Sequence, residues 1–198
     1  MHRRFPLFQS HLDLAHHYWE RLLQKGGWTI DATCGNGKDT LKLAEFLTGK
    51  PGGIIAIDVQ QAALEKTMEL LRIHLSQEES DRIHPFCQSH ATFPLLAKEH
   101  PIQLIVYNLG YLPGSDKQLT TMTSSTLESV RNGLDLIGSG GAVCITCYPG
   151  HEEGRREEQE LLRELTSLDA AAWNICYHTF PNRTLAASLF FIQRMGAV

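Results

Sequence analysis

The chain has 198 residues, of which 42% are hydrophobic, and it carries 18 Lys and Arg against 22 Asp and Glu, for a formal net charge of −4. This length and composition are typical of a single soluble domain, spanning residues 1-198. The sequence lacks both an apolar run long enough to span a membrane and the apolar core of a signal peptide at its start, so we expect a cytoplasmic protein. The acidic balance argues against an extended nucleic-acid footprint but allows a small basic patch.

The five cysteines are an odd number and are not spaced like a secreted disulfide framework. Cys144 and Cys147 lie within residues 142–148, which have the pattern of a buried strand. Residues three apart in a strand point to opposite faces. We therefore expect neither a redox pair nor a zinc site there, and no metal cofactor elsewhere.

A first amphipathic helix is predicted from about Ser10 to Gln24. Ser10 with Asp13 three residues later is typical of a helix N-terminus, apolar residues then recur at helical spacing, and glycines at 26 and 27 end the pattern. Three histidines lie on this helix, at positions 11, 16 and 17. A metal site would need a further ligand that the sequence does not identify, so we interpret them as surface or capping residues.

The segment from Trp28 to Thr40 has the pattern of a buried strand that feeds a tight turn into a helix. The strand ends in Asp31, and Gly35 and Gly37 follow, where the absence of a Cβ lets the backbone approach a ligand. The next helix, from about Asp39 to Leu47, directs its N-terminal amides to the same place. This pattern predicts a nucleotide-type binding loop.

Two ligand classes use such a loop. A dinucleotide fold requires glycine at the first, third and sixth positions, and the sixth position counted from Gly35 is Thr40. The loop of S-adenosylmethionine enzymes has an acid at the strand end, small residues and a Gly-x-Gly. Residues 31–37 match that loop, except that Thr33 stands where the first glycine usually falls. We interpret the segment as the methyl-donor loop, with a purely structural turn as the alternative.

Two further strand ends carry polar residues suited to the same ligand. A predicted strand at 54–58 ends in Asp58, at the interval after the glycine loop at which nucleotide folds place a carboxylate on a ribose. Gln60 begins the next helix. A strand at 82–87 is followed by His90, in the turn that lies beside the adenine in such folds. A solvated Asp58 and a His90 that only holds its loop are the alternatives.

The fourth predicted strand, Ile102–Tyr107, leads into residues 108–114, with the sequence Asn-Leu-Gly-Tyr-Leu-Pro-Gly. This loop resembles the Asn-Pro-Pro-Tyr loop of amine methyltransferases, in which the Asn carbonyl accepts a proton from the substrate nitrogen and the ring packs on it. Leu109-Gly110 replaces the two prolines here. A structural turn with Tyr111 in the core is the alternative.

Ser125 with Glu128 resembles a capping box for a further helix, which the glycine-rich residues 138–141 end. A strand at 142–148 and an amphipathic helix at 152–168 follow.

Two extended runs, at 173–180 and 187–193, close the chain, and their connection is too short for a crossover helix, so they are expected to be antiparallel. Five strand and helix units with a terminal hairpin predict an α/β, Rossmann-like class I methyltransferase fold. This fold is a seven-stranded, mostly parallel sheet with an antiparallel last strand and helices on both faces.

Three segments carry a resemblance to a known family: Asp-Ala-Thr-Cys-Gly-Asn-Gly-Lys-Asp-Thr at 31–40, Asn-Leu-Gly-Tyr-Leu-Pro-Gly-Ser-Asp-Lys at 108–117 and Tyr-Pro-Gly-His at 148–151. Over nearly its whole length the chain resembles the bacterial family once labelled rRNA methylases, whose characterised members are MnmM-type tRNA methyltransferases. The resemblance implies methylation of the amine of 5-aminomethyl-2-thiouridine at tRNA wobble position 34, with S-adenosylmethionine as donor and S-adenosylhomocysteine as product. Ser115 stands where a second glycine is expected.

The strand ends and the resemblance together give the candidate site residues. The candidate cofactor-binding residues are Asp31, Thr33, Gly35, Asn36, Gly37, Asp39, Thr40, Asp58, Gln60, His90, Asn108 and Gly110. The candidate catalytic residues are Asn108, Tyr111 and Asp116, and the candidate substrate-binding residues are Tyr111, Pro113, Lys117, His151, Arg155 and Arg183. An aliphatic ammonium has no lone pair, so a group nearby must accept a proton. The candidates for that acceptor are Asp116, Asp39 and His151.

The expected partner is a tRNA anticodon arm, with an extruded wobble base stacked on Tyr111. The small basic surface of a compact acidic monomer favours a homodimer. The residues alone leave three alternatives open: a methyltransferase for rRNA or a small-molecule amine, a non-catalytic nucleotide- or RNA-binding module and, last, a hydride-transfer enzyme.

Overall fold

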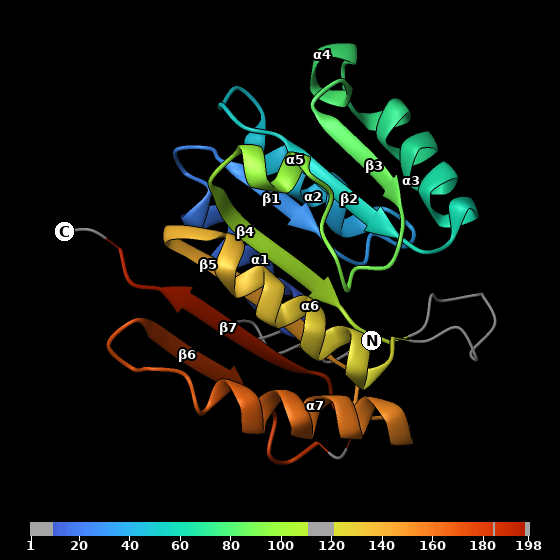
Figure 1. Ribbon diagram of the computed structural model, residues 1–198. Helices are drawn as coiled ribbons and strands as arrows, with labels where there is room; N and C mark the ends of the chain where they lie inside the picture. The colour runs from blue at the N-terminus through green and yellow to red at the C-terminus, as the bar shows by residue number, and fades with distance from the viewer. Residues whose placement is uncertain (1–9, 111–120, 184, 197–198) are drawn as a thin grey trace.

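The computed structural model describes residues 10–110, 121–183 and 185–196. Within these residues seven strands form one sheet in the order β3-β2-β1-β4-β5-β7-β6 (Figure 1). In chain order the strands are β1 (Trp28–Asp31), β2 (Ile54–Asp58), β3 (Ile83–Cys87), β4 (Ile102–Asn108), β5 (Ile137–Cys147), β6 (Trp173–His178) and β7 (Ser188–Arg194). Strands β1 to β5 run parallel, whereas β7 is antiparallel to both of its neighbours. The predicted sheet, with its reversed last strand, is confirmed.

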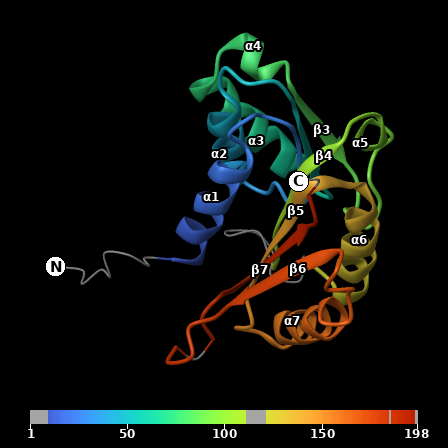
Figure 2. The ribbon, with the colours of Figure 1, turned by 90° about the vertical axis from the view of Figure 1, so that its left-hand side faces the viewer.

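Helices cover both faces of this sheet. They are α1 (His11–Leu22), α2 (Lys38–Leu47), α3 (Gln61–His74), α4 (Gln77–Ser80), α5 (Leu96–Glu99), α6 (Thr123–Leu136) and α7 (Glu152–Leu165). Figure 2 shows α1, α2 and α3 on one side of the sheet and α5, α6 and α7 on the other. Ser10 caps α1 by accepting from the Asp13 N–H at 3.1 Å, as the sequence predicts. None of the described helices is long and apolar enough to cross a membrane.

The sheet separates two apolar cores. Leu43 of α2 and Cys144 of β5 belong to the core under the first group of helices, and Leu161 of α7 and Cys147 belong to the core on the other face. The two cysteines therefore point to opposite faces, as their spacing predicts. Burial raises the pKa of both thiols, that of Cys144 to about 12, which leaves them protonated and unreactive at neutral pH.

Strand β5 begins earlier than the sequence predicts. It starts at Ile137 rather than Ala142 and takes in the glycine-rich residues 138–141. Ile137 pairs with Ile102 at the start of β4, and the register then shifts, so that Ala142 pairs with Leu104. The glycines form a bulge between these two pairs, where missing side chains let the strand bend without losing its place in the sheet.

Helix α6 also differs from its prediction at its N-terminus. It begins at Thr123, and Ser125 lies inside its first turn rather than at its cap. The Thr123 N–H donates to Glu153 of α7 at 2.8 Å. A carboxylate from another helix therefore caps α6, and a pattern confined to neighbouring residues does not reveal such a partner.

The strand order reverses at β1, which lies between β2 and β4 although β2 and β3 follow it directly in the chain. In open α/β sheets, ligands bind beyond the carboxyl ends of the strands at such a switch point. The last residues of β1, β2 and β4 are Asp31, Asp58 and Asn108. Polar side chains therefore end three neighbouring strands at the edge where a ligand is expected.

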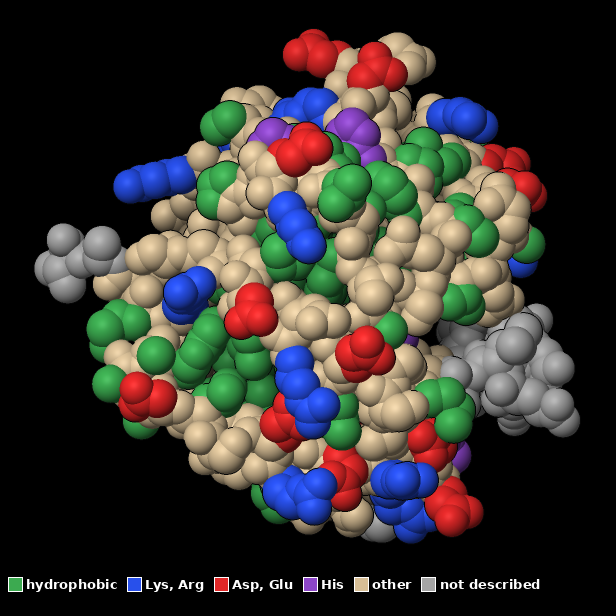
Figure 3. Space-filling view, in the orientation of Figure 1, with side chains coloured by type: hydrophobic (Ala, Val, Ile, Leu, Met, Phe, Trp, Pro, Cys, Tyr) green, Lys and Arg blue, Asp and Glu red, His purple; other side chains and the backbone are tan. Residues whose placement is uncertain are grey.

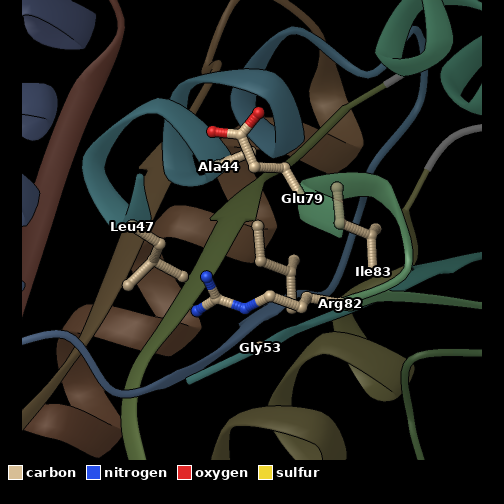
Figure 4. Close-up of a pocket in the computed structure, with 7 residues that line it drawn as sticks. Ala44, Leu47, Gly53, Glu79, Arg82 and Ile83 are labelled. Atoms are coloured by element: carbon tan, nitrogen blue, oxygen red, sulfur yellow. The ribbon is translucent and has the colours of Figure 1, made fainter. Parts of the chain in front are cut away.

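The opposite end of the sheet holds a small hollow of about 10 Å³, which is the size of one water molecule. Its lining residues are Ala44, Leu47, Gly53, Ile54, Glu79, Arg82 and Ile83 (Figure 4). The Arg82 guanidinium beside it donates to the Gly52 and Lys50 carbonyls. This hollow lies at the amino ends of β2 and β3 and is too small for a metabolite.

Candidate active site

Asp31 ends β1 and is 1% exposed. Its carboxylate accepts from the Thr40 hydroxyl at 2.6 Å and from the Thr33 N–H at 3.3 Å. Burial, together with the negative charges of Asp39 and Asp58, raises the pKa of Asp31 to about 7 against the lowering effect of the two hydrogen bonds. Thr40 lies in the first turn of α2, so this pair fixes the start of that helix to the end of β1.

Asp58 ends β2 and holds the glycine loop. One carboxylate oxygen accepts from the Gly35 N–H at 2.9 Å, and the other accepts from the Gln60 N–H at 2.9 Å. A carboxylate offers about four acceptor positions, so each oxygen keeps one for a ligand hydroxyl. The geometry fits a residue that positions the loop and binds two hydroxyls at once.

Gly37 precedes α2 with φ of +78°, in the left-handed region that favours glycine. A Cβ there would lie 2.9 Å from the Cα of Thr67 on α3. The Thr67 hydroxyl donates to the Gly35 carbonyl at 3.0 Å. The loop is therefore packed against α3, and a side chain at Gly37 is excluded by packing as well as by backbone conformation.

Asn108 ends β4, and its backbone and side chain are both committed. Its N–H donates to the Thr33 hydroxyl at 2.8 Å, and its Nδ2 donates to the Asp39 carboxylate at 3.0 Å. The remaining amide oxygen, Oδ1, is buried and has no hydrogen-bond partner among the described residues. A buried acceptor without a partner is costly, so this atom marks the place where a donor from a ligand fits.

Thr33 explains the departure from the usual donor loop. Its hydroxyl accepts from the Asn108 N–H, while its own N–H donates to Asp31. Glycine at this position would leave that Asn108 N–H without its partner. Thr33 thus joins the end of β1, where the methyl donor is expected, to the end of β4, where the substrate is expected. The sequence alone does not reveal this link.

Helix α1 contributes two histidines to this edge. His16 Nε2 lies 3.3 Å from the Asp39 carboxylate, and His11 Nε2 lies 3.1 Å from the Tyr148 hydroxyl. The interpretation of these histidines as surface or capping residues is therefore wrong for both, since each contacts a residue beside Asn108. Burial lowers the pKa of His11, and burial together with the Asp39 charge raises the pKa of Tyr148 to about 12.

His90 follows β3 and is 8% exposed. Its Nε2 is buried without a partner in the described part of the chain, and its ring meets Tyr107 edge-on, with centroids 6.1 Å apart. Burial lowers the pKa of His90, although the Asp58 charge acts in the opposite direction. A neutral ring with one unpartnered nitrogen fits the role of a polar contact to an adenine.

The other sequence-predicted residues fall into three groups. Asn36 lies half-buried in the glycine loop, and His151 caps α7 by accepting from the Gly154 N–H at 3.0 Å. Arg155 on α7 and Arg183 are exposed, and the Arg183 guanidinium lies over the Phe180 ring at 4.7 Å. Four predicted site residues lie outside the described residues: Tyr111, Pro113, Asp116 and Lys117.

The glycine loop, the unpartnered nitrogen of His90 and the open acceptor positions of Asp58 lie together at one edge of the sheet. These groups fit S-adenosylmethionine, whose ribose, adenine and amino-acid parts need hydroxyl acceptors, a polar ring contact and close backbone approach. Within the described residues no cluster of three His, Cys, Asp or Glu side chains forms that could hold a metal ion. Fold and site together define a class I S-adenosylmethionine-dependent methyltransferase.

Comparisons with known proteins place the chain within this class. Residues 54–194 match the model of the family described as "Putative rRNA methylase". The chain is 32% identical over 185 residues to an Arabidopsis thaliana protein named tRNA (mnm5s2U34)-methyltransferase, chloroplastic, and the match covers 91% of this chain and 68% of that protein. The chain belongs to this rRNA methylase family of methyltransferases.

Two solved structures extend the comparison. A Clostridium thermocellum protein under the same rRNA-methylase description has 26% identity and a TM-score of 0.85, covering 94% of this chain and 98% of that one. A Streptococcus mutans protein described as a putative methyltransferase, in complex with S-adenosylhomocysteine, has 27% identity and a TM-score of 0.78, covering 98% and 100%. With the family match, these establish the chain as an enzyme that uses S-adenosylmethionine.

Proposed function

We propose that this methyltransferase methylates the exocyclic amine of 5-aminomethyl-(2-thio)uridine at wobble position 34 of tRNA, giving 5-methylaminomethyl-(2-thio)uridine. Two observations support this reaction. The Arabidopsis relative is named for the same modified base, and the chain covers most of that protein's length. The buried, unpartnered Oδ1 of Asn108 is an acceptor suited to an amine N–H, and it carries the proposal because it gives the substrate nitrogen a place to bind.

The orientation of the Asn108 amide follows from its neighbours. The Asp39 carboxylate only accepts hydrogen bonds, so the side of the amide that faces it at 3.0 Å must be Nδ2. Oδ1 then necessarily points the other way. Asp39 is thus the positioning residue for the acceptor oxygen, and an exchange of the amide ends would place two oxygens against each other.

S-adenosylmethionine supplies, when bound, a methyl group on a sulfonium that departs as a neutral thioether. The chain mainly has to hold the amine in line with that methyl group, with its lone pair free. Asn108 Oδ1 accepts a hydrogen bond from one amine N–H. The nitrogen lone pair then points away from Oδ1 and is free to attack the methyl group. The backbone link from Asn108 to Thr33 keeps this contact in register with the donor loop.

The amine must also lose a proton, because the ammonium form has no lone pair. Among the candidates within the described residues, Asp39 contacts the Nδ2 side of the Asn108 amide, so the amine proton would reach it through one water, whereas His151 Nδ1 is already committed to the cap of α7. The Asp39 side chain is 13% exposed and lies against His16, which is 25% exposed. A proton accepted at Asp39 can therefore pass to His16 and on to solvent. Asp116 lies outside the described residues and remains a prediction.

Recognition of an anticodon arm rests on basic side chains near the same edge. Arg155 in the first turns of α7 and Arg183 are exposed there. Basic side chains over α7 are interspersed with acidic ones (Figure 3), so the arginines would make separate phosphate contacts rather than form one basic surface. A homodimer, expected from the acidic net charge of −4, would bring two such sets together.

The test is methylation of tRNA from a strain that lacks this gene, followed by mass spectrometry of the wobble nucleoside. Wild-type enzyme should convert the aminomethyl base to the methylaminomethyl base, and Asn108→Ala should not, while still binding S-adenosylmethionine.

A second candidate is a methyltransferase for rRNA or a small-molecule amine. It is favoured because the basic side chains over α7 are interspersed with acidic ones. Methylation of rRNA or of the free nucleoside, with undermodified tRNA ignored, would replace the first reaction by the second.

A further inference from the structure

Glu157 on α7 is a carboxylate that the proposed reaction does not use, although it is only 1% exposed. Its two oxygens accept from two threonine hydroxyls, Thr126 Oγ1 at 2.5 Å and Thr121 Oγ1 at 3.1 Å. Burial, together with the Glu153 charge, raises the pKa of Glu157 to about 7 against the lowering effect of the two hydroxyls. Burying a carboxylate is costly, so this group needs a structural or functional reason.

Thr121 connects this carboxylate to the end of β4, where the substrate amine is proposed to bind. Its hydroxyl accepts from the Gly110 N–H at 2.9 Å, and its own N–H donates to the Gly110 carbonyl at 3.2 Å. A hydrogen-bonded chain therefore runs from the Gly110 N–H through the Thr121 hydroxyl to Glu157. Gly110 follows Asn108 by two residues and has φ of +109°, a conformation that other residues rarely adopt.

A second contact from the same helix secures this arrangement. Glu153, one turn before Glu157 on α7, accepts from both the N–H and the hydroxyl of Thr123 at 2.8 Å. Residues 121–126 are thus held to α7 at three positions, of which only Thr121 also contacts Gly110. The contacts differ in their consequence, because the loss of the Thr126 or Thr123 contact leaves the Gly110 link in place.

We propose that Glu157 is a positioning residue for methyl transfer. Through Thr121 it fixes the backbone at Gly110, and so holds the end of β4 from which Asn108 binds the substrate amine. The proposal rests on the proposed role of Asn108. Removing the link should leave the donor site intact, since the side-chain hydrogen bonds of Asp58 go to Gly35 and Gln60 and, within the described residues, none joins Asp58 to this chain of hydrogen bonds. Loss of the link should lower turnover, because Asn108 Oδ1 would no longer hold the amine in line with the methyl group.

Thr121→Val and Thr126→Val form a matched pair for the test, because each removes one hydroxyl donor from the same carboxylate. Thr121→Val should lower kcat about tenfold, with the dissociation constant of S-adenosylmethionine unchanged within about twofold. Thr126→Val should lower the unfolding midpoint at least as much but keep about half of kcat or more. Thr121→Ser, which keeps the hydroxyl, should restore turnover, and a purely structural role would not give this separation.

Backbone amide exchange at Gly110, followed by NMR, provides a readout that needs no substrate. The amide should be protected in wild type and in Thr126→Val and exchange faster in Thr121→Val and Glu157→Ala. Equal protection in all four proteins, or equal kcat losses for both valine variants, would overturn the positioning role. If wild-type enzyme leaves undermodified tRNA unmethylated, the proposed substrate fails, whereas the exchange result still decides the role of Glu157.

Discussion

The carboxyl edge of the sheet has two halves that are held in different ways. In the donor half, at the ends of β1 and β2, acidic side chains bind the backbone and hydroxyls of their own loops: Asp31 binds Thr33 and Thr40, and Asp58 binds Gln60. In the acceptor half, at the ends of β4 and β5, the partners come from distant helices. The donor half is thus nearly complete in its own segment, whereas the acceptor half depends on the docking of α1 and α7.

This difference has a physical consequence for catalysis. A site for a common donor can be rigid and locally built, because its ligand is always the same. The acceptor oxygen of Asn108 depends on Asp39 of α2 and, through it, on α1, while Gly110 depends on α7. Substitutions in the two halves should therefore separate: donor-half changes alter donor affinity, and acceptor-half changes alter turnover at saturating donor.

The largest effect should come from Asn108→Ala, which removes the acceptor oxygen but leaves the backbone link to Thr33. We expect kcat to fall about 100- to 1000-fold, as when a single group that contacts the reacting atoms is lost. The dissociation constant of S-adenosylmethionine, measured by calorimetry, should change less than about threefold. A parallel loss of donor affinity would mean that the side chain belongs to the donor half instead.

Asp58→Ala should have the opposite signature. It removes both the proposed ribose contact and the acceptor for the Gly35 N–H, so donor affinity should fall about 10- to 100-fold. At saturating S-adenosylmethionine, kcat should stay within a few-fold of wild type. Asp81→Ala, at the exposed end of α4, is the control that removes an acid outside this edge. An unchanged donor affinity in Asp58→Ala would assign the carboxylate to loop geometry alone.

His16→Ala should lower kcat about threefold to tenfold, because Asp39 loses the partner that orients it and passes its proton onward. His17→Ala is the matched control, since this neighbour on α1 is exposed. If both histidine variants behave like wild type, α1 has no part in proton transfer.

The buried acid of the donor half predicts a pH dependence of stability. Asp31 has a pKa of about 7 in the folded protein against 3.8 as its ordinary value, so between these pH values the folded state binds a proton that the unfolded state has lost. The free energy of unfolding should therefore fall as pH rises from about 4 to about 7. Asp31→Asn should reduce this fall by about 1 to 3 kcal/mol in urea titrations. An identical slope would show that Asp31 is ionised throughout.

The two halves also differ in how much of them can be predicted from sequence. The seven strands, the reversed last strand and the convergence of Asp31, Asp58 and Asn108 follow from apolar runs and strand-end residues, which are local signals. Cytoplasmic location and a single domain remain predictions. The donor half is predictable because its residues lie within one or two adjacent loops.

The acceptor half is not predictable in the same way. His16 looks like any polar residue on an amphipathic helix, and only the docking of α1 brings it to Asp39. Ser125 has the local pattern of a cap, yet α6 begins earlier because Glu153 of α7 supplies the cap. Glu157 lies in a charged run that reads as a solvated face. Contacts between residues 23 to 36 positions apart, as in these pairs, leave no periodic signal in a single sequence.

The smallest effect should come from the RNA-binding side chains, since each contributes one phosphate contact to an interface without a broad basic surface. Arg155→Ala should weaken tRNA binding about twofold to threefold and reduce the slope of log affinity against log salt concentration by about 0.7 to 0.9. Arg72→Ala is the control, because this exposed arginine lies toward the end of α3, which begins at the strand-end edge and leads away from it. A salt slope that both variants leave unchanged would exclude Arg155 from the interface. A slope that only Arg155→Ala reduces, with kcat at saturating tRNA preserved, would separate binding of the RNA backbone from the alignment of the amine at Asn108.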